Sequence, residues 1–285
     1  MPWPVSALPY PFELGFMQRA LVAGVAVGVF APMIGTFLVQ KRMSLIGDGI
    51  GHVAFAGVAL GYLLGIAPVA TALVASDAGA IAVEWLRSRR RASGDLALAL
   101  FFYSGIALGV VLVSLGGGLN ASLLTYLFGQ PLTVNDSELV VILILGAVIV
   151  VAMLLLRRVL FAVVTDEDWS RVSGLPVGFV NNVLAVLTAV AVVAAMRIVG
   201  ILLIAAMMVL PVASGQVLAR SFGSTLRWSI AVSVSSVIVG LAVSRIWGTA
   251  PGGTIVLIAA GVFAVVSIAK RGVAPRLPVA KEADL

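Results

Sequence analysis

One aspartate and the only histidine of the chain stand four residues apart in an apolar stretch. Asp48 and His52 lie within MSLIGDGIGHVAFAGVALG, residues 43–61. On an α-helix, residues i and i+4 share a face, so the two side chains would point the same way, one turn apart. A carboxylate oxygen beside an imidazole nitrogen suits zinc and tolerates manganese or iron. Two ligands are too few for tight zinc binding, so the spacing indicates at most a transient metal site.

The same pair has two other interpretations. Asp48 and His52 could relay a proton, or could form a structural bridge that holds two helices together. A carboxylate in the core of a bilayer costs at least about 2.5–3.5 kcal/mol, so it normally faces the protein interior. Glycines at positions 47, 49, 51 and 57 would leave the helix thin beside the pair, with room for an ion. Spacing alone leaves the three interpretations open.

The composition indicates that these residues lie in a membrane. Of the 285 residues, 61% are hydrophobic and only 11% are charged, which leaves too little polar surface for a soluble domain of this length. In lipid the backbone must satisfy its own hydrogen bonds, and long apolar runs without alternation select helices rather than a barrel. We therefore expect an all-α polytopic integral membrane protein with about eight to nine transmembrane helices in one domain.

Nine apolar segments can be traced along the chain. They cover residues 20–39, 45–65, 67–86, 96–115, 138–156, 177–195, 198–219, 228–247 and 252–269. The stretch 116–137 is too broken by glycine, proline and polar residues to span, and we expect a re-entrant or surface segment there. If one weaker segment lies in the interface, the count falls to eight.

Basic residues favour the nine-span arrangement with the N-terminus outside. Such a topology places 15 of the 18 lysines and arginines on the cytosolic side and leaves only Arg19, Arg197 and Arg245 on or near the outer side, as the positive-inside rule requires. The net charge of +6 then reflects topology rather than nucleic-acid binding. Arg197 is expected to extend toward the lipid headgroups, or else to contact an acidic surface of an external partner.

Several classes of activity are excluded by residue type. The chain has no cysteine, hence no disulfide, thiolate metal site or nucleophilic thiol. It also lacks the H-E-x-x-H pattern of an intramembrane metalloprotease. A P-loop needs Gly-Lys followed by Ser or Thr, but Lys41, Lys270 and Lys281 follow Gln, Ala and Ala. The chain is therefore not expected to be an enzyme, and any ATP hydrolysis must come from another subunit.

Four separated motifs resemble one transporter family. KRMSLIGDGIGHVAFAGVALGYLLG is similar to the signature of the permease subunits of bacterial ABC importers for zinc, manganese or iron, with Val53 where Ala is usual. LLTYLFGQPLTV resembles a second family motif, apart from Pro131. VGILLIAAMMVLPVASGQVLARSF resembles a third, with Val212 and Ser214 as departures, and TAPGGTIVLIAA resembles a fourth. The four motifs follow one another in the same order as in the family, and together they cover most of the chain.

The resemblance implies a function and a set of partners. Residues 1–285 would form a single permease domain of the bacterial inner membrane, with extramembrane tails at 1–13 and 272–285. Asp48 and His52 would line the path and coordinate a divalent cation, zinc rather than manganese or iron, as transported substrate, with no permanently bound cofactor. A second copy of the chain, a cytosolic ABC ATPase and an extracytoplasmic metal-binding protein would complete the importer. His52 must be neutral to donate a lone pair, so transport should weaken as pH falls through its pKa.

The resemblance also suggests where the ATPase docks. TDEDWSRVSGLPVG, residues 165–178, is polar and resembles a short helix of the family. Acids at 166–168 suit a helix N-terminus, and Gly174 and Pro176 would end the helix. A plain solvated loop is the alternative, and residues 219–227 are a second candidate contact.

Other polar and sulfur-containing side chains in the spans have uncertain roles. Asp77 and Glu84 are seven residues apart on one helical face. Glu84 is expected to pair with the Arg87–Arg91 cluster, whereas Asp77 could serve either structure or the path. Met207 and Met208 could ligate a soft metal, but core packing is the favoured interpretation.

Two other kinds of transporter are alternatives to this one. A proton- or sodium-coupled secondary transporter could use Asp48 and His52 as a relay, but would be expected to show inverted repeats, and none is convincing. A permease for cobalamin or siderophores would need a wide, mostly apolar vestibule rather than an acid and an imidazole.

Overall fold

The computed structural model describes residues 10–88, 94–118 and 121–273, and within these ranges the regular structure is entirely helical. Eight of the helices are long and apolar enough to cross a membrane, which confirms the expected all-α polytopic class. The elements are α1 (Gly15–Gln40), α2 (Ile46–Leu64), α3 (Pro68–Ser88), α4 (Gly94–Leu115), α5 (Ala121–Phe128), the 3-10 helix η1 (Pro131–Thr133), α6 (Asp136–Thr165), α7 (Glu167–Val172), α8 (Val177–Ala195), α9 (Ile204–Leu218), α10 (Phe222–Trp247) and α11 (Pro251–Val273).

Eight of the nine predicted apolar segments correspond to these long helices. The prediction for 198–219 was too long, because α9 is a 15-residue helix preceded by turns. Residues 198–203 lie against α5 instead: the backbone N–H groups of Ile201 and Leu202 donate to the carbonyls of Tyr126 and Leu127, at 3.0 and 3.3 Å. These bonds satisfy backbone polar groups that a non-helical segment would otherwise leave unpaired in an apolar environment.

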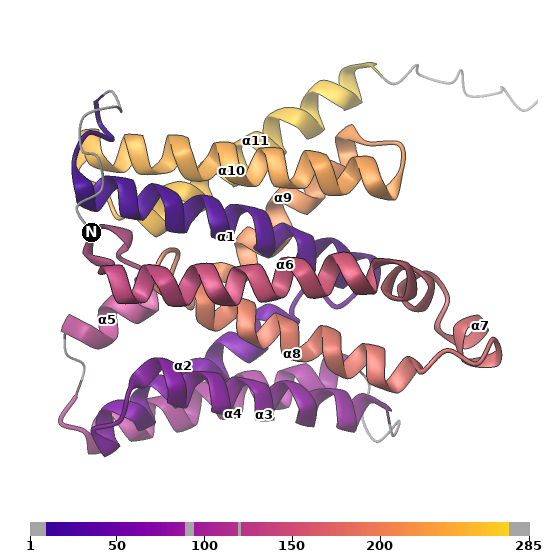
Figure 1. Cartoon of the computed structure of the whole chain (residues 1–285), viewed down its shortest axis with the longest axis horizontal. Coiled ribbons are helices and arrows are strands. Elements are labelled where there is room, and N and C mark those ends of the chain that lie inside the picture. The colour runs from indigo at the N-terminus through magenta and orange to yellow at the C-terminus, as the bar shows by residue number, and fades with distance from the viewer. Residues whose placement is uncertain (1–9, 89–93, 119–120, 274–285) are drawn as a thin grey trace, which may run out of the picture.

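The long helices lie side by side in three groups (Figure 1). α2, α3 and α4 pack together on one side of the bundle, α1, α9, α10 and α11 lie on the other, and α6 and α8 run between them. α7 projects from one end, here called the α7 end. The predicted tails 1–13 and 272–285 fall almost wholly outside the described residues, as do the predicted cytosolic Arg89, Arg90, Arg91, Arg276 and Lys281.

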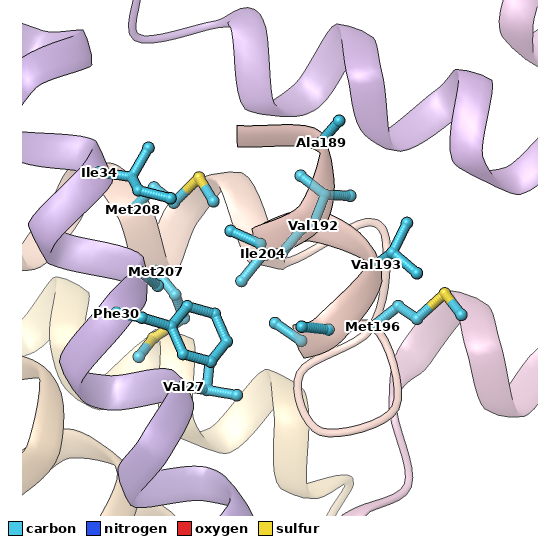
Figure 2. Close-up of a cluster of buried hydrophobic side chains, with 14 of the residues drawn as sticks. Val27, Phe30, Ile34, Ala189, Val192, Val193, Met196, Ile204, Met207 and Met208 are labelled. Atoms are coloured by element: carbon cyan, nitrogen blue, oxygen red, sulfur yellow. The ribbon is translucent and has the colours of Figure 1, made fainter. Parts of the chain in front are cut away.

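The core lies where α1, α8 and α9 meet. Figure 2 shows its closely packed apolar side chains: Val27, Phe30 and Ile34 from α1, Ala189, Val192 and Val193 from α8, Met196, and Ile204, Met207 and Met208 from α9. Met207 and Met208 are fully buried among these carbon atoms, so the packing interpretation of the two methionines is confirmed. This core forms a rigid support behind α2, since Gly47 of α2 faces the sulfur of Met208.

Glycines let α3 and α4 approach α2 closely. A Cβ added at Gly57 of α2 would lie 2.7 Å from the Cα of Ala72 in α3, and one added at Gly105 of α4 would lie 2.9 Å from the carbonyl carbon of His52. Neither contact leaves space for a methyl group. Close approach of this kind stabilises transmembrane helices by van der Waals packing, and it holds α2 between its two neighbours.

Candidate functional site

Asp48 and His52 lie side by side on one face of α2, as the i,i+4 spacing predicts. His52 Nε2 is 3.8 Å from Asp48 Oδ1, too far for a hydrogen bond but close enough for both atoms to contact one ion. Asp48 is in the first turn of α2, where the N-terminal end of the helix dipole favours a negative charge. The His52 side chain is 10% exposed and that of Asp48 is 32% exposed. The carboxylate is therefore the more accessible of the two groups.

The His52 ring is held by α4. Its centroid lies 4.4 Å from that of Phe102, and the two rings are inclined at 77°. This edge-to-face arrangement is a favoured geometry for aromatic rings. Together with the close approach of Gly105 to the His52 backbone, it limits the directions in which the imidazole nitrogens can point.

A hollow of about 280 Å³ lies between α2 and α4 beside the pair. Leu45, Asp48 and Gly49 line it from α2 and the turn before it, and Leu98, Ala99, Phe102 and Tyr103 line it from α4. Asp48 is the only charged group among these lining residues. Because a water molecule occupies roughly 30 Å³, the hollow can hold a partly hydrated cation next to the carboxylate.

Within the part of the chain that the structure describes, no cluster of three or more histidine, aspartate or glutamate side chains could hold a metal ion. Within the described residues, Asp48 and His52 therefore form a pair with one oxygen donor and one nitrogen donor. Asp77 has one oxygen that is buried without a hydrogen-bond partner in the structure, but it does not join Asp48 and His52 in a ligand group. The pair can hold a cation only with water or with groups from outside the described chain.

Glu84 belongs to a different site. Its carboxylate is held by Arg87 through two hydrogen bonds of 2.8 Å each, from Nε and from Nη2. The expected pairing of Glu84 with the arginines that follow it is confirmed for Arg87. This acid is neutralised at the α7 end of the bundle and contributes nothing to the hollow beside Asp48.

The structure does not support a headgroup-facing Arg197. Its side chain is only 14% exposed, forms an ion pair with Glu138 at 3.0 Å, and lies over the ring of Tyr126. Sequence reasoning missed Glu138, although the pattern N-D-S-E marks a capping box: the Asn135 side chain accepts from the Glu138 N–H, and Glu138 accepts from the Asn135 N–H. The pair joins the start of α6 to the turns after α8.

A short polar helix forms at the α7 end, as the sequence predicts. Asp166 is the N-cap of α7 and accepts a hydrogen bond from the Trp169 N–H at 2.9 Å. The chain leaves the helix through Gly174, whose φ is +80°. Trp169 and Val172 are exposed on the surface of this helix, so it presents two large apolar side chains to whatever lies beyond the bundle.

The second candidate contact is not an independent element. Within residues 219–227, only the first three residues connect α9 to α10, and Ser221 is the N-cap of α10 through a hydrogen bond from the Ser224 N–H. The remaining residues are the first turns of α10. An exposed helix between two spans is therefore found at α7 and not here.

Comparison with known proteins relates the chain to a family of transporters. The family model described as "ABC 3 transport family" matches residues 13–270. The chain is 33% identical to the "High-affinity zinc uptake system membrane protein ZnuB" of Haemophilus influenzae over 260 residues, 91% of this chain and 98% of that one. It is 31% identical to the "Manganese transport system membrane protein MntC" of Halalkalibacterium halodurans over 249 residues, 87% of this chain and 85% of that one.

A solved structure shares the fold over nearly the whole length. "PsaBC from Streptococcus pneumoniae in complex with Fab" superposes with a TM-score of 0.80 at 30% sequence identity, and the match covers 92% of this chain and 93% of that one.

Proposed function

The chain belongs to the ABC 3 transport family, and from this premise we propose that it is the permease subunit of an ATP-driven metal-ion importer. It is a multi-pass protein of the bacterial inner membrane. Its substrate is a divalent cation, with zinc as the preferred ion, which passes Asp48 and His52 on its way through the membrane.

The observation that carries the proposal is the 3.8 Å distance between His52 Nε2 and Asp48 Oδ1. The pair lies beside a hollow in which Asp48 is the only charged residue among those that line it. The carboxylate attracts the cation, and the imidazole supplies a nitrogen ligand that zinc accepts more readily than manganese does. Weak two-point coordination suits a transport path, because an ion must leave as easily as it enters. Manganese is an alternative substrate, since relatives are named for zinc and for manganese transport. Iron is a further alternative, which rests on the resemblance of the sequence motifs alone.

The position of the hollow supports a homodimer. Leu45 and Tyr103, which line the hollow, are strongly exposed. Leu100 and Leu108 of α4 are exposed as well, so the surface around the hollow is apolar. An exposed carboxylate facing hydrocarbon would cost at least about 2.5–3.5 kcal/mol. A second copy seated on this face would cover Asp48 and place its own Asp48 and His52 near the first pair. The two chains together would offer the four ligands that one chain lacks.

The energy source and the metal donor are separate proteins in this proposal. α7, with Trp169 and Val172 exposed, docks a cytosolic ABC ATPase, which makes the α7 end of the bundle cytosolic. An extracytoplasmic metal-binding protein delivers the ion to the opposite end. A role in nucleic-acid binding is not proposed.

An ion-coupled secondary transporter is the alternative function, with Asp48 and His52 as the proton relay. Family membership favours the ATP-driven importer, because the named relatives are described as parts of uptake and transport systems. Proteoliposomes separate the two functions. ATP-dependent zinc uptake that needs the ATPase supports the proposal, whereas uptake by the chain alone under a proton or sodium gradient supports the alternative.

The site itself is tested by Asp48→Ala combined with His52→Ala in the reconstituted importer. Uptake should be abolished while membrane insertion and dimer formation remain unchanged. The double variant Arg19→Ala and Asp136→Ala is a matched control, since it also removes one ion pair, but at the end of the bundle opposite α7. Undiminished zinc uptake by the site variant would overturn the assignment of the path.

A further inference from the structure

Charged and polar side chains from four helical elements meet at the α7 end. Lys41 lies just after α1, Glu84 and Arg87 lie in the last turns of α3, Glu167 is the first residue of α7, and Asn181 belongs to α8. We call these five residues the α7-end cluster. None of them belongs to the metal path proposed above.

Glu167 is the centre of this cluster. Its Oε2 lies 3.7 Å from Lys41 Nζ and 3.6 Å from Arg87 Nη1. Its Oε1 lies 3.4 Å from Asn181 Nδ2, which donates to it. Lys41 in turn donates to Asn181 Oδ1. One carboxylate at the start of α7 thus connects that helix to the ends of α1, α3 and α8.

These contacts are mostly removed from water. The Lys41 side chain is 8% exposed and that of Arg87 is 20% exposed, Glu84 is buried, and Glu167 is 29% exposed. Screening by solvent and salt is weak in such surroundings, so the attraction between Lys41 and Glu167 is stronger than that of a surface pair. Loss of Glu167 would leave the buried Lys41 charge without full compensation.

α7 has little else to hold it in place. It is six residues long, its large apolar side chains Trp169 and Val172 point away from the bundle, and only Ser170 is fully buried. Hydrophobic packing therefore contributes little to its attachment. Within the described residues, the ion pairs of Glu167 with Lys41 and Arg87 link α7 to α1 and α3.

Lys41 lies close to the metal site in the chain. It is the C-cap of α1, and only residues 42–45 separate it from α2, which carries Asp48 in its first turn. The connection is a tight turn: Arg42 and Met43 donate backbone hydrogen bonds to Val39 and Leu38 at 3.1 and 2.8 Å. Arg42 adopts φ +59° without being glycine, a strained conformation that persists only where its surroundings hold it. Because this turn is short and hydrogen-bonded, a displacement of Lys41 would also displace the start of α2.

We propose that the Lys41–Glu167 contact transmits movement of α7 to the start of α2, and so couples ATP hydrolysis to opening of the metal path. Lys41 and Glu167 are positioning residues in this scheme, because neither touches the metal. The inference rests on the proposed function, in which α7 receives the ATPase. Arg87 supports the contact from α3, because its Nη1 lies 3.6 Å from the same carboxylate oxygen, Glu167 Oε2.

The test measures zinc uptake and ATP hydrolysis in the same proteoliposomes, with the cognate ATPase present. Glu167→Gln should lower the number of zinc ions transported per ATP by about fivefold or more, the size of a typical coupling effect, while ATPase binding and dimer elution stay unchanged. Asp136→Asn, which breaks an ion pair at the opposite end, should leave the ratio unchanged.

Rescue by a covalent link distinguishes transmission from simple stabilisation. The chain has no cysteine, so Lys41→Cys with Glu167→Cys can be joined selectively by a short bifunctional thiol reagent. The uncrosslinked double variant should hydrolyse ATP with little uptake, and crosslinking should restore much of the lost coupling. An unchanged number of zinc ions transported per ATP in Glu167→Gln would overturn this inference but not the proposed function. The same holds if the crosslinked double variant is as uncoupled as the uncrosslinked one. Absence of ATP-dependent zinc uptake by the unaltered protein overturns the proposed function and this inference with it.

Discussion

The imidazole of His52 stands edge-on to the ring of Phe102, with centroids 4.4 Å apart, so the orientation of the histidine on α2 depends on a residue of α4. Phe102 also lines the hollow that contains Asp48. The aromatic contact therefore connects ligand geometry to the packing of two helices. A change in how α4 lies against α2 would alter the direction of the imidazole nitrogens without any change in the ligands.

Phe102→Leu should raise the KM for zinc by about two- to tenfold with a smaller effect on kcat. The reason is that an aromatic pair contributes about 0.5–1.5 kcal/mol beyond its burial, and its loss frees the His52 ring to adopt unproductive orientations. Zinc uptake at varied concentrations measures the effect. Leu257→Ala, at an exposed position of α11, is the control, and equal KM values in the two variants would contradict a role for Phe102.

Gly105→Ala should destabilise the protein by about 1–3 kcal/mol, because the new Cβ would lie 2.9 Å from the His52 carbonyl carbon and must push α4 away from α2. Thermal unfolding in detergent measures the change. Gly261→Ala is a matched control within α11, where an added Cβ meets nothing within 4 Å. That variant should keep or raise stability, since alanine favours helix over glycine by up to about 1 kcal/mol. Equal destabilisation by both would show that the two helices are not packed as described.

Glu138→Gln should destabilise the protein more than Asp136→Asn does, although the two acids are neighbours in the first turn of α6. Glu138 pairs with a mostly buried Arg197, and hydrogen bonds to charged groups contribute about 1.5–3 kcal/mol. Asp136 is 63% exposed and pairs with Arg19, an arrangement that contributes about 0–1 kcal/mol. Thermal unfolding of both variants in one detergent tests the order. A larger effect of Asp136→Asn would contradict the assigned burial of the Arg197–Glu138 pair.

Hydropathy and spacing predicted the features that depend on local sequence. The i,i+4 placement of Asp48 and His52 followed from helix geometry, and the short helix α7 followed from the three acids at 166–168 and Gly174. The turns at 198–203 were missed, because an apolar segment packed against α5 has the same hydropathy as one that spans. Gly200, with φ +95°, was the available signal.

Features that depend on distant partners could not be predicted. Arg197 pairs with Glu138, 59 residues away in the chain, whereas the sequence suggested only lipid headgroups or an acidic surface of another protein as its partner. The α7-end cluster draws on four helical elements whose approach is fixed by packing of the whole bundle. Which charges are neutralised, and by which neighbours, is a property of that packing rather than of any one segment.

The charge of Lys41 gives a pH test of the α7-end cluster. Burial and, to a lesser extent, the charge of Arg87 lower the pKa of Lys41 to about 8, although Glu84 and Glu167 oppose the shift. Below about pH 8 the ammonium group is charged and attracts Glu167. As the pH on the α7 side rises from 7 to 9, this attraction is lost, and the number of zinc ions transported per ATP should fall.

Stability should change in the opposite direction over a similar range, which separates loss of coupling from loss of structure. Between about pH 8 and the unfolded pKa of 10.5, the unfolded chain binds a proton at Lys41 that the folded chain does not, so the contribution of this group to stability rises with pH. Lys41→Arg should make the coupling ratio insensitive to pH from 7 to 9, because a guanidinium group stays charged throughout. Uptake, hydrolysis and thermal unfolding measured on both proteins at each pH test these expectations. A parallel fall of coupling and stability in the unaltered protein, or the same pH dependence in Lys41→Arg, would contradict transmission through the Lys41 charge.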